Sequence, residues 1–177
     1  GAAAVSCTKL YISLGVKPEN IIMCDSRGVV NKKRTDLNSQ KKQFITERNI
    51  DTLEQALVGA DVFLGLSIGG IVNKKMVSSM ADKPVVFALA SPDTEIDYNE
   101  AIESKEGVIV ATGRSDYPNQ INNVLGFPYI FRGALDVRAS TINEEMKIAS
   151  VHAIDKLAKE PSPESVHAAY NESKIIF

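Results

Sequence analysis

VFLGLSIGG, residues 62–70, is the stretch from which the fold can be predicted. It begins with a continuous apolar run, Val62–Leu66, which is typical of a strand buried on both faces of a sheet. A small, glycine-bearing turn follows directly. Similar apolar runs recur at Ile21–Cys24, Val85–Leu89 and Val108–Ala111. Each of these runs is followed by a turn and then by a helical stretch. The sequence therefore predicts an α/β fold with a parallel sheet.

Helical patterns separate these strands. They are predicted at Ala2–Leu14, Gln40–Glu47, Thr52–Val58, Lys74–Met80 and Asn99–Ser104. Asp51 is a predicted N-cap, and Thr141 with Glu144 forms a predicted capping box for a longer helix. A last helix and the start of a strand are predicted over 164–170 and 174–177.

Right-handed crossovers on a parallel sheet give a doubly wound, Rossmann-like domain, whose ligands bind at the carboxyl ends of the strands. The loops that begin at Asp25, Ser67, Ala90 and Thr112 are therefore where a site is expected. We expect residues 1–177 to form one such domain with C-terminal helices, lacking its first strand.

Composition excludes several classes of protein. The chain has 177 residues, a net charge of −2 and 24% charged residues, and no apolar run of the roughly 18 residues that would span a membrane. Near-neutral charge predicts no nucleic-acid partner. Two cysteines cannot form a disulfide framework, so a cytoplasmic protein is expected.

Small residues open the chain. Gly1, Ala2, Ala3 and Ala4 begin a predicted helix with tiny side chains, so its backbone N–H groups are accessible to an anion such as a pyrophosphate. They look like the second half of the G-x-G-x-x-A turn of dinucleotide-binding domains. Taken alone, an alanine-rich start is more often just a stable helix without a ligand.

Asp25 lies about 20 residues after that turn, where dinucleotide-binding domains place the carboxylate that contacts the adenosine ribose. The alternative is an Asp that only forms the turn Asp25–Gly28. A basic cluster follows, made up of Arg27, Lys32, Lys33 and Arg34. These cations could pair with a 2′-phosphate, or they could simply belong to a solvated loop. NAD and NADP therefore both remain open.

Two further loops carry candidate residues. Ser67 lies in a flexible turn that can pass beneath a cofactor, although a plain strand-to-helix loop explains it nearly as well. Ser91 precedes a proline, which keeps it extended at the end of a strand. Asp93 and Glu95 are possible acid–base groups, but solvated residues near the next helix start are the favoured interpretation.

The loop at 111–123 is rich in hydrogen-bonding side chains, among them Asn122 and Asn123. Amides can bind a carboxylate or a carboxamide, but the same residues also form Asx turns. His152 and His167 have no neighbouring Cys or His in the sequence, so neither a metal site nor a Ser-His-Asp triad is predicted.

Together these segments resemble malic enzymes, in particular the bacterial forms, over essentially the whole chain. The matching segments are residues 1–4, 24–29, 59–67, 87–96 and, most specifically, 111–123 continuing through 127–136. The resemblance implies oxidative decarboxylation of malate to pyruvate, with NAD or NADP accepting the hydride and Mg or Mn bound in the complete enzyme.

The resemblance also assigns roles. Gly1–Ala4 would bind the pyrophosphate, Asp25 the ribose, and Ser67 would lie near the cofactor. Asn122, with Asn123, would bind the malate carboxylate or the nicotinamide amide. Ser91 is a candidate for either ligand, although the family usually has Asn there and Pro in place of Thr94.

The family's catalytic Tyr and Lys and its metal-binding Glu and Asp precede the glycine turn, so no catalytic or metal residue is assigned here. Lys9, Tyr11 and Asp36 do not lie in those motifs. We expect malate or pyruvate as the ligand, and a homo-oligomer. The alternatives are a non-catalytic dinucleotide-binding module and another two-domain oxidoreductase of the amino-acid-dehydrogenase type.

Overall fold

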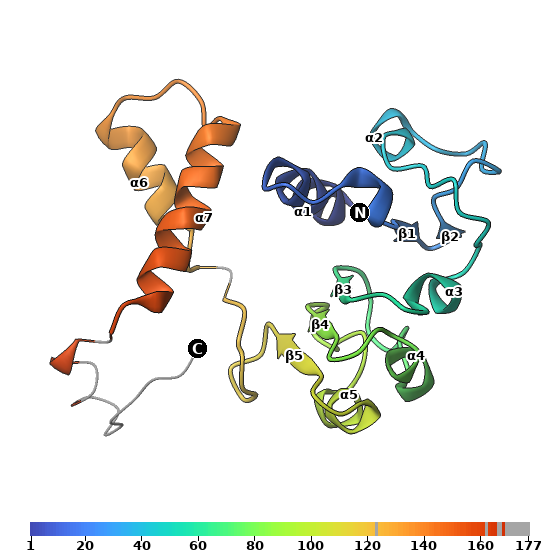
Figure 1. Ribbon diagram of the computed structural model, residues 1–177. Helices are drawn as coiled ribbons and strands as arrows, with labels where there is room; N and C mark the ends of the chain where they lie inside the picture. Colours follow the sequence, from blue (N-terminus) through green and yellow to red (C-terminus); the bar gives the residue numbers. More distant parts are fainter. Residues whose placement is uncertain (123, 162, 166–167, 169–177) are drawn as a thin grey trace. The chain divides into compact units, whose positions relative to one another are not determined.

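A computed structural model describes residues 1–122, 124–161, 163–165 and 168 (Figure 1). The chain divides into two compact units, Gly1–Ile121 and Asn122–Phe177. The elements predicted over 164–170 and 174–177 lie largely outside the described residues.

The first unit contains a three-stranded parallel sheet. Its strands are β3 (Val62–Gly65), β4 (Val85–Ala88) and β5 (Ile109–Thr112), in that spatial order. Val62 pairs with Val85, and Val85 pairs with Ile109. The α/β class and the parallel sheet predicted from the apolar runs are confirmed, and the loops after these strands share one edge.

A short helix precedes each sheet strand along the chain: α3 (Leu53–Leu57) before β3, α4 (Lys74–Ser78) before β4 and α5 (Tyr98–Ser104) before β5. Their buried residues pack with the sheet in one apolar core that includes Val77, Val86 and Val110. The predicted N-cap Asp51 is wrong. Thr52 caps α3 in a capping box with Gln55. The Asp51 carboxylate instead accepts hydrogen bonds from the side chains of Asn31 and Lys33.

Burial along the strands differs from the prediction. Phe63, Val86 and Val110 are buried, whereas Leu64 and Phe87, on the opposite face, are half-buried. In β3 and β4, the continuous apolar runs therefore mark complete burial on one face and partial burial on the other.

The N-terminal part holds a second small core. Helix α1 (Ala2–Ser13) packs against it through Val5 and Ile12, and its buried residues are Met23, Val30, Leu37 and Phe44. A 3-10 turn, η1 (Pro18–Asn20), and the short helix α2 (Ser39–Lys42) complete this part.

The prediction of a parallel strand at Ile21–Cys24 is wrong. β1 (Cys24–Asp25) pairs antiparallel with β2 (Gly28–Val29) in a separate two-stranded hairpin. The tight turn needs Gly28, whose φ is +100° and where a Cβ would lie 2.3 Å from the Asp51 carbonyl oxygen. The glycine thus turns the chain back on itself.

The second unit contains α6 (Tyr129–Asp136) and α7 (Glu144–Lys159). Asn143 caps α7 by accepting a hydrogen bond from Met146 N–H, so the predicted cap at Thr141 is wrong. None of the helices in the described part of the chain has the length and hydropathy needed to cross a membrane.

Candidate functional site

The first residues of α1 form one wall of a pocket of about 420 Å³. The other wall comes from the start of α2, and the lining residues are Gly1, Ala2, Val5, Ser6, Lys9, Asn38, Gln40 and Lys41. No side chain among the described residues caps the start of α1. Free N–H groups, small side chains and a nearby ammonium group suit a phosphate anion.

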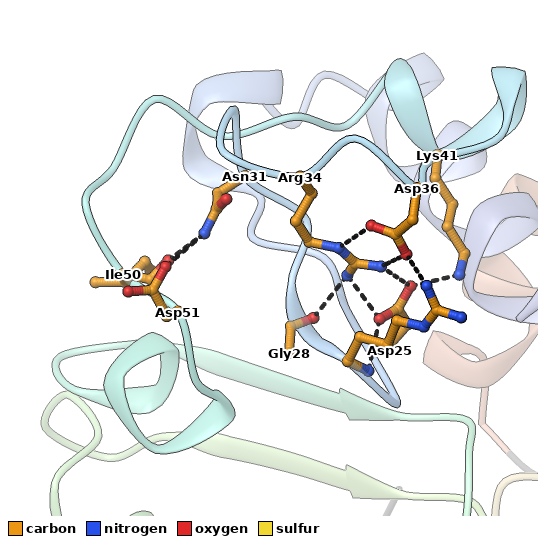
Figure 2. A network of polar contacts seen from close by, with 9 residues as sticks. Asp25, Gly28, Asn31, Arg34, Asp36, Lys41, Ile50 and Asp51 are labelled. Carbon is orange, nitrogen blue, oxygen red and sulfur yellow. Dashed lines mark hydrogen bonds and ion pairs between the residues drawn. The ribbon is translucent and has the colours of Figure 1, made fainter.

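Asp25 lies at the end of β1 in a network of charged groups (Figure 2). Its carboxylate is almost buried, with 8% of the side chain exposed. Arg34 donates two hydrogen bonds to it, from Nη1 to Oδ1 at 2.7 Å and from Nη2 to Oδ2 at 3.2 Å, and Lys41 Nζ donates a third. The Arg27 backbone N–H donates to Oδ1 as well, at 2.9 Å.

Asp36 closes the network on its other side. It accepts hydrogen bonds from Arg34 and from Arg27, the latter at 2.9 Å. Three cationic groups, Arg27, Arg34 and Lys41, thus surround two carboxylates, Asp25 and Asp36. The network carries one net positive charge.

These contacts fix the protonation states of the network. Burial raises the pKa of the Asp25 carboxyl, but the hydrogen bonds from Arg34 and Lys41 outweigh it, and the pKa lies well below its usual range. The Arg34 guanidinium lowers the pKa of Asp36 to about 2. Burial, and then the adjacent Asp25 charge, raises the pKa of the Cys24 thiol to about 11. Both carboxylates are therefore charged at neutral pH, and Cys24 is a thiol.

The basic cluster predicted from the sequence is divided by the structure. Only Arg34 of the four joins Asp25 directly through its side chain. Lys32 and Lys33 pair elsewhere, with Glu47 and Asp51, and are exposed. Lys41 was not among the sequence candidates, because it lies on another element and only the fold brings it to Asp25.

Both oxygens of the Asp25 carboxylate already accept hydrogen bonds from protein donors. A carboxylate that binds ribose hydroxyls would instead need an oxygen that is accessible to the ligand. Its ribose-binding role remains a prediction. To serve it, the carboxylate would have to exchange a donor such as Lys41, which lies on the pocket wall.

A second group of candidates lies at the carboxyl edge of the three-stranded sheet. Ser67 and Ser91 are exposed on the loops after β3 and β4. Glu95 is fully buried between these loops, and its carboxylate accepts hydrogen bonds from the backbone N–H groups of Ser67 and Ala90, each at 3.0 Å. The interpretation of Glu95 as a solvated residue is wrong, because these two amides replace water.

The loop after β5 uses many of its polar groups internally. Asn119 donates to the Val110 carbonyl at 3.1 Å, and Arg114 pairs with Asp116. Tyr117 stacks on Tyr98 at the start of α5, with ring centroids 4.5 Å apart. Much of the hydrogen-bonding density noted in the sequence therefore shapes the loop itself.

Asn122 belongs to the second unit. Its side-chain oxygen accepts a hydrogen bond from Val124 N–H at 2.8 Å, which is an Asx-type turn contact. The side chain is exposed. Asn123 lies outside the described residues, so the roles of both amides stay predictions.

Within the described ranges, no three His, Cys, Asp or Glu side chains are grouped so as to hold a metal ion. A larger hollow of about 500 Å³ lies between Pro18 and Arg48 and contains none of the predicted site residues.

Comparison with known proteins adds an independent observation. The family model described as "Malic enzyme, NAD binding domain" matches residues 12–172. The chain is 55% identical over 178 residues to an NADP-dependent malic enzyme of Rhizobium meliloti, covering all of this chain and 23% of that protein. It is 52% identical over 177 residues to an NADP-dependent malic enzyme of Halomonas elongata, covering 42% of that protein.

Solved structures agree. The crystal structure of an NAD-dependent malic enzyme from Thermotoga maritima is similar with a TM-score of 0.76 and 38% identity, covering 90% of this chain and 42% of the other. The chain therefore spans less than half the length of each of these relatives.

Proposed function

Because this chain belongs to the malic enzyme family, matching its NAD-binding domain over residues 12–172, we propose that the whole protein oxidises and decarboxylates malate to pyruvate, with NADP as the preferred hydride acceptor. That family match carries the proposal. The dinucleotide, when bound, accepts the hydride that malate loses. The described residues act by binding and orienting the two ligands.

The start of α1 would bind the pyrophosphate. Gly1, Ala2 and Ala3 are exposed, and a Cβ at position 1 would meet no atom within 4 Å, so a phosphate group can approach the backbone closely. Negative charge at this helix end is favoured by the helix dipole. In this assignment Ala4 keeps the helix close to its neighbours.

The preference for NADP is proposed from charge. A carboxylate that accepts ribose hydroxyls repels a 2′-phosphate, but Asp25 is neutralised by Arg34 and Lys41. Lys41 also lines the pocket. Its ammonium group can therefore turn to a 2′-phosphate while Arg34 continues to pair with Asp25. The relatives from Halomonas elongata and Rhizobium meliloti, 52% and 55% identical to this chain, are named NADP-dependent, which supports the same choice.

The carboxyl-edge loops would hold the rest of the cofactor and the substrate. We propose that Ser67 and Ser91 line the nicotinamide side, since both are exposed at the ends of neighbouring parallel strands. Asn122, with Asn123, would bind a malate carboxylate or the nicotinamide amide. Ser91 offers one hydroxyl where the family usually has an amide, so its contact with substrate would be weaker by about 0.5–1.5 kcal/mol.

The doubly wound topology also belongs to this proposal, with a first strand preceding residue 1. The Mg or Mn that the resemblance implies has no ligand set within the described ranges, and no step is assigned to it. We propose that the metal ligands and the catalytic Tyr and Lys lie in the remainder of the whole protein. Homo-oligomerisation and a cytoplasmic location are proposed on the same basis.

The test is a turnover assay on the whole protein, with malate and either dinucleotide, scoring reduced cofactor, pyruvate and carbon dioxide together. Formation of all three in equal amounts is expected. Dinucleotide binding without malate-dependent turnover would instead favour the non-catalytic module.

A further inference from the structure

Glu95 is a buried charged residue that the proposed chemistry leaves without a role. It lies before α5 and has no exposed surface. Burial of an uncompensated carboxylate is strongly unfavourable, so such groups are found hydrogen-bonded. Here the two oxygens are used separately: Oε1 accepts from Ser67 N–H and Oε2 from Ala90 N–H, each at 3.0 Å.

The two amides belong to different loops. Ser67 lies in the loop after β3, and Ala90 lies in the loop after β4, so one side chain bridges the carboxyl ends of two neighbouring strands. Backbone contacts continue the bridge along the chain. Gly70 N–H donates to the Thr94 carbonyl at 3.0 Å, and Val72 N–H donates to the Glu95 carbonyl at 2.9 Å.

Two glycines make room for this bridge. A Cβ at Gly65 would lie 2.3 Å from the Glu95 carboxyl carbon, and a Cβ at Gly69 would lie 2.7 Å from Asp93 Cβ. At neither glycine is φ in the left-handed region. Close approach of the two loops, rather than backbone conformation, is therefore what requires glycine at these positions.

We infer that Glu95 is a positioning residue, whose buried carboxylate holds the backbones of Ser67 and Ala90 and so sets the loops after β3 and β4 in one arrangement for the dinucleotide. The inference rests on the proposed function, because the cofactor is what these loops would receive. Ser91 follows Ala90 directly, so its hydroxyl is placed by the same bridge.

Glu95→Gln in the whole protein tests the inference. Glutamine has nearly the same shape, but its NH₂ group faces a backbone N–H, so one of the two amides loses its acceptor. We expect amide hydrogen exchange to become at least tenfold faster in peptides containing Ser67 and Ala90. The dissociation constant for NADP, measured by calorimetry, is expected to rise about tenfold, with a smaller change in the KM for malate.

Gly65→Ala provides a second variant that displaces the carboxylate without changing it. Its effects on exchange and NADP binding should match those of Glu95→Gln. Two controls complete the set: Glu106→Gln, an exposed residue with the same chemical change, and Val77→Ala, a buried residue of α4 that lowers stability and belongs to neither loop.

The inference is overturned if Glu95→Gln alters loop exchange and NADP affinity no more than Val77→Ala does. It is also overturned if faster exchange leaves the NADP dissociation constant unchanged. Failure of the unmodified protein to turn over malate would refute the proposed function, whereas the exchange measurement on Ser67 and Ala90 would still report on the bridge.

Discussion

The Asp25 carboxylate and the Arg34 guanidinium meet at two points, 2.7 Å from Nη1 to Oδ1 and 3.2 Å from Nη2 to Oδ2. Such a paired fork is the strongest geometry for these two groups. The pair occupies the carboxylate that sequence spacing assigns to the adenosine ribose.

Arg34→Ala leaves a nearly buried carboxylate with Lys41 as its remaining side-chain donor. We expect the free energy of unfolding to fall by about 2–4 kcal/mol, measured by urea denaturation. Arg27→Ala is the matched control, since its side chain is 70% exposed, and it should cost at most about 1 kcal/mol. Equal losses in the two variants would contradict the assignment of Arg34 as the principal partner of Asp25.

Acid should weaken this part of the fold. The pKa of Asp25 is lowered in the folded protein and that of Asp36 is lowered to about 2, both below the unfolded value of about 3.9. A lowered pKa stabilises the fold above the unfolded pKa, and this stabilisation is lost as the pH falls through the folded pKa. The free energy of unfolding should therefore decline below about pH 5.

Asp25→Asn isolates one contribution to that decline. Its unfolding free energy should depend less steeply on pH between about pH 5 and pH 3, whatever its absolute stability. Asp82→Asn, at an exposed position, should keep the slope of the unmodified protein. A slope unchanged by Asp25→Asn would show that the carboxylate has the same pKa in the folded and unfolded states.

Lys41→Ala tests the proposed contact with a 2′-phosphate. The KM for NADP should rise about tenfold or more in the whole enzyme, because an ammonium–phosphate contact is lost, whereas the KM for NAD should change little. Lys42→Ala is the control, since Lys42 is exposed and is not among the residues that line the pocket. Equal increases for both dinucleotides would place Lys41 outside 2′-phosphate recognition.

Asn122→Ala tests the proposed substrate contact. In the whole enzyme we expect the KM for malate to increase more than the dissociation constant for NADP. Losing the turn contact to Val124 alone would perturb the local backbone without such selectivity. Equal damage to malate use and dinucleotide binding would argue against a substrate role.

The sequence predicts the parallel sheet well because three short apolar runs must be buried together, whichever helices cover them. It fails at Ile21–Cys24, where Gly28 turns the chain back and Asp51 packs against that turn. Apolar character alone cannot distinguish a sheet strand from one arm of a hairpin. Helix α6 was also missed, since its eight residues follow Pro128 and have no capping side chain.

The candidate site residues likewise divide into those that local sequence points to and those that only the fold brings together. Spacing singles out Asp25, whose ribose-binding role stays a prediction, whereas Lys41 lies on α2 and is brought to Asp25 only by tertiary structure. Glu95 looks like a solvated residue beside a helix start, because the sequence does not reveal that two backbone amides meet it. The signal available was indirect: Gly65, at the end of a strand, leaves space for a neighbouring group.

The most direct test of the central claim is to compare NADP with NAD as oxidants of malate in the whole protein, measuring kcat/KM for each from reduced cofactor and pyruvate. We predict malate-dependent formation of both products with a higher kcat/KM for NADP. Absence of malate-dependent reduction with either dinucleotide would contradict the proposed reaction, and a higher kcat/KM for NAD would contradict the role given to the Asp25, Arg34 and Lys41 network.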